Sequence, residues 1–145
     1  MTIVKFYDPL YVPDSKLTYS VIAARFKDKW LFVRHKDRTT WEIAGGHIED
    51  NESPFDAASR ELTEETGAID FSIVCVATYS VEKNGGIGFG RLFFAEVSSL
   101  AEVTDISEIE EVILKDHLPE DLTYPDIQPH LFRKIIEFLE ERERT

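Results

Sequence analysis

The sequence has a single cysteine, Cys75, so no disulfide can form within the chain. Its Cys and His residues show no zinc-site spacing. Cys75 lies in the apolar run FSIVCVATY, where we interpret it as a small buried side chain rather than a nucleophile. No apolar run approaches the ~20 residues that cross a bilayer, and MTIVKFYDPLYVPDSK lacks the features of a signal peptide. We therefore expect a cytoplasmic protein that does not act at a membrane.

Positive charge is scarce: 16 Lys and Arg residues stand against 28 Asp and Glu residues, giving a formal net charge of -12. Nucleic-acid binding through phosphates needs the opposite sign, so we expect no nucleic-acid partner. The segment from Arg25 to Arg38 is an exception, with six basic and two acidic side chains. This local excess of positive charge is consistent with binding a small anionic ligand or with a solvated basic hairpin.

The 145 residues, 43% of them hydrophobic and 12% aromatic, suffice for the core of one domain. We find no internal repeat, low-complexity tract or linker. We therefore expect residues 1–145 to form a single domain.

Runs of β-branched and apolar residues predict several strands. We expect strands over 17–26, 30–36, 39–46, 71–81, 91–99 and 110–118, and an amphipathic helix from about Gln128. Residues 17–36 read as a hairpin, and the glycine-rich EKNGGIGFG is interpreted as a flexible hairpin turn. Strands interleaved with two helices predict an α/β protein with a mixed sheet packed against helices.

The other helix, over residues 53–66, is predicted from the residues at its two ends. Ser53 suits the N-cap and Pro54 the first helical position. Gly67 is placed to end the helix in a left-handed conformation.

Three glutamates crowd this helix. At 100° per residue, Glu61, Glu64 and Glu65 fall within about a 100° arc, where they repel each other. They also lie toward the helix C-terminus, where the dipole disfavours anions. A hard divalent cation bound by their oxygens is one explanation, and a solvated acidic face is the other.

The flanking residues favour the first explanation. Gly46 is followed, at fixed spacing, by Glu52, Arg60-Glu61-Leu62, Glu64-Glu65 and Gly67. This stretch resembles the signature of the Nudix hydrolase family and matches it at every fixed position. Ala68 is the one departure, since the family prefers a larger aliphatic residue there. The order of the remaining elements resembles the MutT-type Nudix fold, which implies an α/β/α sandwich with a mixed sheet between helices.

The resemblance implies a role for each residue of the motif. Glu61, Glu64, Glu65 and the carbonyl of Gly46 would hold Mg²⁺ or Mn²⁺, with Glu61 and Glu64 also catalytic and Glu61 a candidate general base. Glu52 and Arg60 would form a structural ion pair, and Gly67 would end the helix.

A further catalytic carboxylate is expected on the loop before the last strand, as in several family members. The segment DISEIEEVILKD offers Glu108, Glu110 and Glu111, of which we favour Glu108 from its position.

Residues before and within the motif are candidates for substrate binding. We expect phosphate contacts from among Arg34, Lys36, Arg38 and His47, and an aromatic wall for the base at Trp41. Phe32, Tyr79 and Phe89 are further candidates for that wall. We interpret His35, His117 and His130 as surface residues.

The resemblance implies hydrolysis of a nucleoside diphosphate linked to another moiety. The stretches WEIAGGHIED and LTYPDIQPHLF are similar to MutT-like members that act on nucleoside triphosphates, some of them oxidised purine nucleotides. We therefore favour a (deoxy)nucleoside triphosphate cleaved to the monophosphate and pyrophosphate. ADP-sugars, dinucleoside polyphosphates and a non-catalytic ligand sensor are the alternatives. Oligomeric state stays open, although dimers are frequent in the family.

Overall fold

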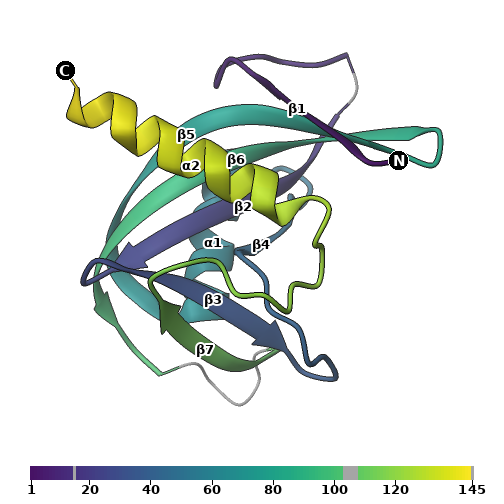
Figure 1. Ribbon diagram of the computed structural model, residues 1–145. Coiled ribbons are helices and arrows are strands. Elements are labelled where there is room, and N and C mark those ends of the chain that lie inside the picture. The colour runs from purple at the N-terminus through teal and green to yellow at the C-terminus, as the bar shows by residue number, and fades with distance from the viewer. Residues whose placement is uncertain (15, 103–107, 145) are drawn as a thin grey trace.

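The computed structural model describes residues 1–14, 16–102 and 108–144 (Figure 1). Its strands are β1 (Ile3–Tyr7), β2 (Leu17–Phe26), β3 (Lys29–His35), β4 (Ala44–His47), β5 (Ala68–Lys83), β6 (Gly86–Leu100) and β7 (Ile109–Lys115). Its helices are α1 (Pro54–Thr66) and α2 (Gln128–Glu143). Within the described residues, neither helix is long and apolar enough to span a membrane.

The strands form one mixed sheet in the order β1-β5-β6-β2-β3-β7, with β4 paired to β2. β2 runs parallel to β6 along its whole length and pairs with β3 only at Arg25 and Phe26. The freed edge of β2 pairs instead with β4, between Tyr19 and Ile22. β3 therefore diverges from β2 after these two pairs, which leaves room beside β2 for a cavity.

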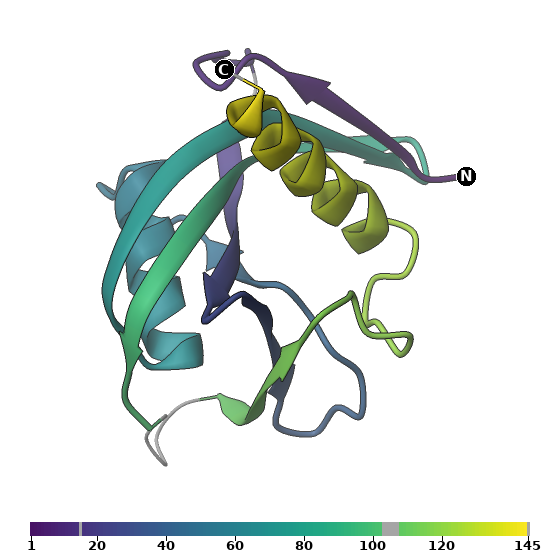
Figure 2. The ribbon, with the colours of Figure 1, turned by 60° about the vertical axis from the view of Figure 1, so that its left-hand side comes forward.

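The sheet is buried on both faces, with α1 on one side and α2 on the other (Figure 2). Alternate residues of a strand point to opposite faces, and β2 shows this directly. Val21 and Ala23 pack in the cluster that contains Leu131 of α2. Ile22 packs in the cluster that contains Leu62 of α1. The predicted α/β/α sandwich with a mixed sheet is thus confirmed.

Helix α1 has the predicted ends. The Ser53 hydroxyl accepts a hydrogen bond from the Asp56 N–H at 3.0 Å, which caps the first turn. At the other end Gly67 adopts φ +81° and its N–H donates to the Thr63 carbonyl at 3.0 Å. Local signals alone therefore set the limits of the helix that carries the three glutamates.

Several predicted boundaries are wrong. The strand expected over 39–46 is reduced to β4, because Trp41 and Glu42 make only isolated bridges to Leu122 and Val33. β1 was not predicted, and it forms only by pairing along β5.

The glycine-rich stretch contains the expected hairpin turn, but most of the stretch belongs to the strands on either side. β5 and β6 remain paired up to Lys83 and Gly86, which leaves a turn of two residues. Asn84 and Gly85 fill that turn with φ +53° and +81°, the left-handed conformations that close a tight hairpin. Cys75 also differs from expectation: it is half-buried on β5 rather than fully enclosed.

Gly67 allows a direct test of this packing. A Cβ there would collide with the carbonyl oxygen of Ala101, whereas Gly85 has the same φ of +81° and open space around it. Gly85→Ala should cost about 1 kcal/mol from backbone strain alone, and Gly67→Ala should cost clearly more. Urea denaturation of both variants measures the difference. Equal losses of stability would show that the contact with Ala101 is not tightly packed.

Candidate active site

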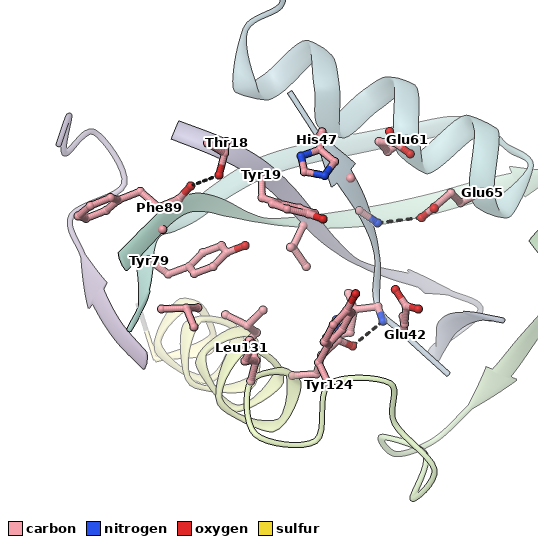
Figure 3. A pocket seen from close by; sticks show the side chains of 18 of the residues that line it. Thr18, Tyr19, Glu42, His47, Glu61, Glu65, Tyr79, Phe89, Tyr124 and Leu131 are labelled. Carbon is pink, nitrogen blue, oxygen red and sulfur yellow. Dashed lines mark hydrogen bonds between the residues drawn. The ribbon is translucent and has the colours of Figure 1, made fainter. Parts of the chain in front are cut away.

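A cavity of ≈ 820 Å³ opens beside β2, between α1 and α2 (Figure 3). In Figure 3, Glu42, Glu61 and Glu65 lie toward one end, and Tyr79 and Phe89 lie toward the other. The cavity lining also includes carboxylates of two further residues, Glu49 and Glu108. The cavity thus joins an acidic region to an apolar, aromatic one.

The acidic end exists because α1 approaches β4 at the bare backbone of Gly45 and Gly46. A Cβ at Gly46 would lie 2.5 Å from the Glu61 Oε1, and a Cβ at Gly45 would lie 2.6 Å from the Ser20 carbonyl oxygen. The Gly45 N–H donates to the Glu65 Oε1 at 2.8 Å. The bare backbone at Gly46 therefore allows the approach of α1, and that at Gly45 allows the close packing of β4 on β2.

Glu65 is the most deeply buried of the three helix glutamates, with 6% of its surface exposed. Burial raises its pKa to about 8, and the Gly45 N–H offsets part of this rise. The carboxylates of Glu61, Glu42 and Glu108 raise the pKa of Glu65 further. Burial also raises the pKa of Glu61, against the lowering effect of Arg60.

His35 belongs to this cluster, so its interpretation as a surface residue is wrong. Its Nε2 lies 3.4 Å from the Glu65 Oε2 and 3.7 Å from the Glu42 Oε1. The last residue of β3 reaches α1 because β3 diverges from β2, a long-range arrangement that no spacing in the sequence reveals.

Arg60 is the main counter-charge beside the glutamates. Its guanidinium donates to Glu52 at 2.7 Å, so the expected pair is present, but it does more than brace the loop. It also contacts Glu61 at 2.9 Å, Glu64 at 3.3 Å and Glu49 at 3.5 Å, and donates to the His47 carbonyl at 3.1 Å. In this structure one cation therefore balances four carboxylates.

The structure separates the three glutamates. Glu61 and Glu65 line the cavity, whereas the side chain of Glu64 is 58% exposed, points toward Arg60 and is not part of the lining. Of the loop carboxylates, Glu108 lines the cavity and Glu111 instead pairs with Arg34 at 3.2 Å.

The predicted substrate-binding residues divide in a similar way. Arg38 and His47 line the cavity. Arg34 and Lys36 are not part of the lining, and neither is Trp41, whose ring lies under the Arg34 guanidinium at 5.8 Å. Phe32 is part of the core rather than of a base-binding wall.

Sequence reasoning missed several residues of the lining. Tyr19 lies on β2, Glu42 before β4, Tyr124 before α2 and Gln128 at the start of α2. They come from four separate segments, so no motif joins them. Glu42 falls in WEIAGGHIED, and Tyr124 and Gln128 fall in LTYPDIQPHLF, the two stretches whose resemblance could have pointed to them.

The described residues contain no group of three His, Cys, Asp or Glu side chains arranged to hold a metal ion as they stand. The available donors are nevertheless of one chemical kind: the carboxylates of Glu61 and Glu65 and the backbone carbonyl of Gly46. Hard cations such as Mg²⁺ and Mn²⁺ prefer oxygen ligands of this kind. The bare backbone at Gly46 leaves space beside the Glu61 carboxylate that a Cβ would fill. The donor set fits such a cation.

Comparisons with known proteins agree on one family. The NUDIX domain model matches residues 15–135. The chain is 34% identical over 102 residues to "Putative 8-oxo-dGTP diphosphatase YtkD" of Bacillus subtilis (strain 168), covering 70% of this chain and 64% of that protein. It is 40% identical over 55 residues to "Probable DHNTP pyrophosphohydrolase" of Lactococcus lactis subsp. cremoris (strain MG1363), covering 38% of this chain and 32% of that protein. The matches thus span less than two thirds of the length of either relative.

The crystal structure of a mutant of the Bacillus subtilis pyrophosphohydrolase BsRppH has the same fold. It superposes with a TM-score of 0.76 at 28% identity, covering 94% of this chain and 90% of that one.

The raised pKa of Glu65 predicts how stability depends on pH without divalent cations. Between pH 4.5 and about 8 the unfolded state has lost the Glu65 proton and the folded state retains it. The free energy of unfolding should therefore fall as pH rises through this range, by at most roughly 1.4 kcal/mol per pH unit from this group. Urea denaturation in chelator at several pH values measures the slope.

The variant Glu65→Gln should flatten that profile, and Glu110→Gln, an exposed carboxylate outside the cavity, should leave it unchanged. A Glu65→Gln profile parallel to that of the wild type would show that Glu65 titrates normally in the folded protein.

Proposed function

Because the chain belongs to the NUDIX domain family, we propose that it is a divalent-metal-dependent pyrophosphohydrolase. Its favoured substrate is a (deoxy)nucleoside triphosphate, cleaved to the monophosphate and pyrophosphate. Residues 1–145 act as a single Nudix hydrolase domain. The observation that carries the proposal is a pair of carboxylates, the buried Glu65 and the partly buried Glu61, at the acidic end of a cavity large enough for a nucleotide.

Mg²⁺ or Mn²⁺ would be held by Glu61, Glu65 and the Gly46 carbonyl, with Glu64 completing the set. When bound, the cation neutralises phosphate oxygens and lowers the pKa of a bound water. Burial and the neighbouring carboxylates of Glu61, Glu42 and Glu108 together make a charged Glu65 unfavourable and raise its pKa to about 8. This unfavourable arrangement supports a cation site over a solvated acidic face.

The remaining steps fall to side chains that line the cavity. A water oxygen bonds to a phosphorus of the substrate as the bond to the bridging oxygen breaks and pyrophosphate leaves. The water proton passes to a carboxylate, for which Glu61 and Glu108 are the candidates. Arg38 and His47 donate hydrogen bonds to the phosphates, and Arg38 is already held in position by Glu42 at 2.6 Å.

The choice of a triphosphate rests on the relatives. The two relatives described above are named for hydrolysis of 8-oxo-dGTP and of DHNTP. Each name describes removal of a diphosphate. An oxidised purine nucleotide is therefore included among the proposed substrates.

The test is release of pyrophosphate in the presence of Mg²⁺. The panel contains canonical and oxidised nucleoside triphosphates, ADP-ribose and diadenosine polyphosphates. We expect turnover of triphosphates, abolished by chelator. Glu61→Gln and Glu65→Gln should each lower kcat about 100-fold or more, since each removes a charged group at the reacting centre.

Glu108→Gln tests the loop carboxylate against a matched control. Glu110 is a neighbouring exposed glutamate outside the cavity, so Glu110→Gln should retain wild-type kcat whereas Glu108→Gln should lower it. Equal activity of the two variants would remove Glu108 from the mechanism. If only ADP-ribose or diadenosine polyphosphates are hydrolysed, that class of compound replaces the triphosphate as the proposed substrate. Tight binding of a nucleotide without its hydrolysis would indicate a ligand sensor.

A further inference from the structure

Two deeply buried polar side chains line the cavity without using their full hydrogen-bonding capacity. Tyr79 is 6% exposed, and its hydroxyl takes part in none of the hydrogen bonds among the described residues. In that same part of the chain, no fully enclosed side-chain nitrogen or oxygen lacks a partner. The Tyr79 hydroxyl must therefore open onto the cavity, and Figure 3 shows it pointing inward from β5.

Gly90 makes this position of Tyr79 possible. It pairs with Tyr79 across β5 and β6, and a Cβ on it would lie 2.5 Å from the Tyr79 Oη. The ring therefore lies over bare backbone. Any side chain at position 90 would displace the hydroxyl from the cavity.

Gln128 supplies the second polar group, with 5% of its surface exposed. Its Oε1 accepts a hydrogen bond from the Ile43 N–H at 2.7 Å. A backbone N–H can only donate, so this bond fixes which end of the amide is the oxygen. The Nε2 group takes part in no hydrogen bond among the described residues, so by the same reasoning it opens onto the cavity as a donor.

Apolar side chains of the lining that pack in the same core cluster as Tyr79 cannot hydrogen-bond to these groups. They include Val21, Val81, Ile127 and Leu131. A buried donor that loses water without gaining a partner weakens binding of the ligand. A ligand that fills this region must therefore offer an acceptor to Gln128, and Tyr79 can donate to the ligand or accept from it.

We infer that Tyr79 and Gln128 bind the base of the nucleotide and select one that carries a carbonyl over one that carries an amino group. Guanine presents the acceptors O6 and N7 on one edge, whereas adenine places an amino donor at position 6. With position 6 of the base at the Gln128 Nε2, the guanine O6 accepts a hydrogen bond, whereas the adenine amino group sets a donor against a donor. The expected selectivity is therefore for nucleotides of 6-oxopurines, such as guanine and hypoxanthine. This inference rests on the proposed function, which takes the ligand to be a nucleotide.

ITP and ATP provide the sharpest comparison, because their bases differ only around position 6. We expect kcat/KM for ITP to exceed that for ATP by about tenfold or more, the discrimination of one well-matched base edge. Gln128→Glu keeps an oxygen for the Ile43 N–H and replaces the donor by an acceptor. This variant should lose the preference for ITP or reverse it.

Tyr79→Phe removes only the hydroxyl, which has no protein partner among the described residues. It should raise KM for ITP several-fold without lowering the thermal stability. Tyr7→Phe is the matched control, since the Tyr7 hydroxyl bonds the Ser80 Oγ at 3.0 Å outside the cavity lining. The control should leave KM unchanged.

Equal kcat/KM for ITP and ATP in the wild type would overturn the inference while leaving the hydrolase intact. A preference that survives both Tyr79→Phe and Gln128→Glu would also overturn it. Calorimetry measures the affinity of the same proteins for IMP and AMP without any hydrolysis. It therefore distinguishes failure of this inference from failure of the proposed function. If no nucleotide is hydrolysed, tighter binding of IMP than AMP, lost in Gln128→Glu, would still support the inference, and equal binding would refute it.

Discussion

The close approach of helix α1 to the bare backbone of β4 is the constraint on which the site depends. Neither Gly45 nor Gly46 has room for a Cβ, because the Ser20 carbonyl and the Glu61 carboxylate occupy that space. This contact brings Glu61 and Glu65 out of solvent and onto the wall of the cavity. The same contact lets the Gly45 N–H bond Glu65, so one backbone approach both buries the carboxylates and partly stabilises them.

Repulsion among the glutamates is balanced in two ways. Arg60 contacts Glu61 and Glu64 directly, so its guanidinium reduces the repulsion between carboxylates on the outer side of the cluster. It does not contact Glu65, whose pKa is raised to about 8. The proposed function places a divalent cation at this inner side, where it would supply the missing positive charge.

The part of the site that lies in one stretch of sequence was predictable, and the part assembled by the sheet was not. Helix α1 follows from Ser53 and Gly67, which act within a turn of their own position. His35 depends on the divergence of β3 from β2, and Tyr79 on the bare backbone of Gly90 in the next strand. These contacts join residues far apart in the chain, so no local pattern reveals them. The fold class was predictable because continuous runs of β-branched and apolar residues are typical of strands that are buried on both faces of a sheet.

Binding of Mn²⁺ tests the central claim most directly, because it requires no substrate. Electron paramagnetic resonance at pH 7.5 would measure binding to the wild type and to the double variant Glu61→Gln/Glu65→Gln. The double variant Glu110→Gln/Glu140→Gln loses the same two charges from exposed positions and serves as control. The account predicts that the wild type and the control bind Mn²⁺ alike and that the Glu61/Glu65 variant loses the site. Equal binding by all three proteins would contradict it.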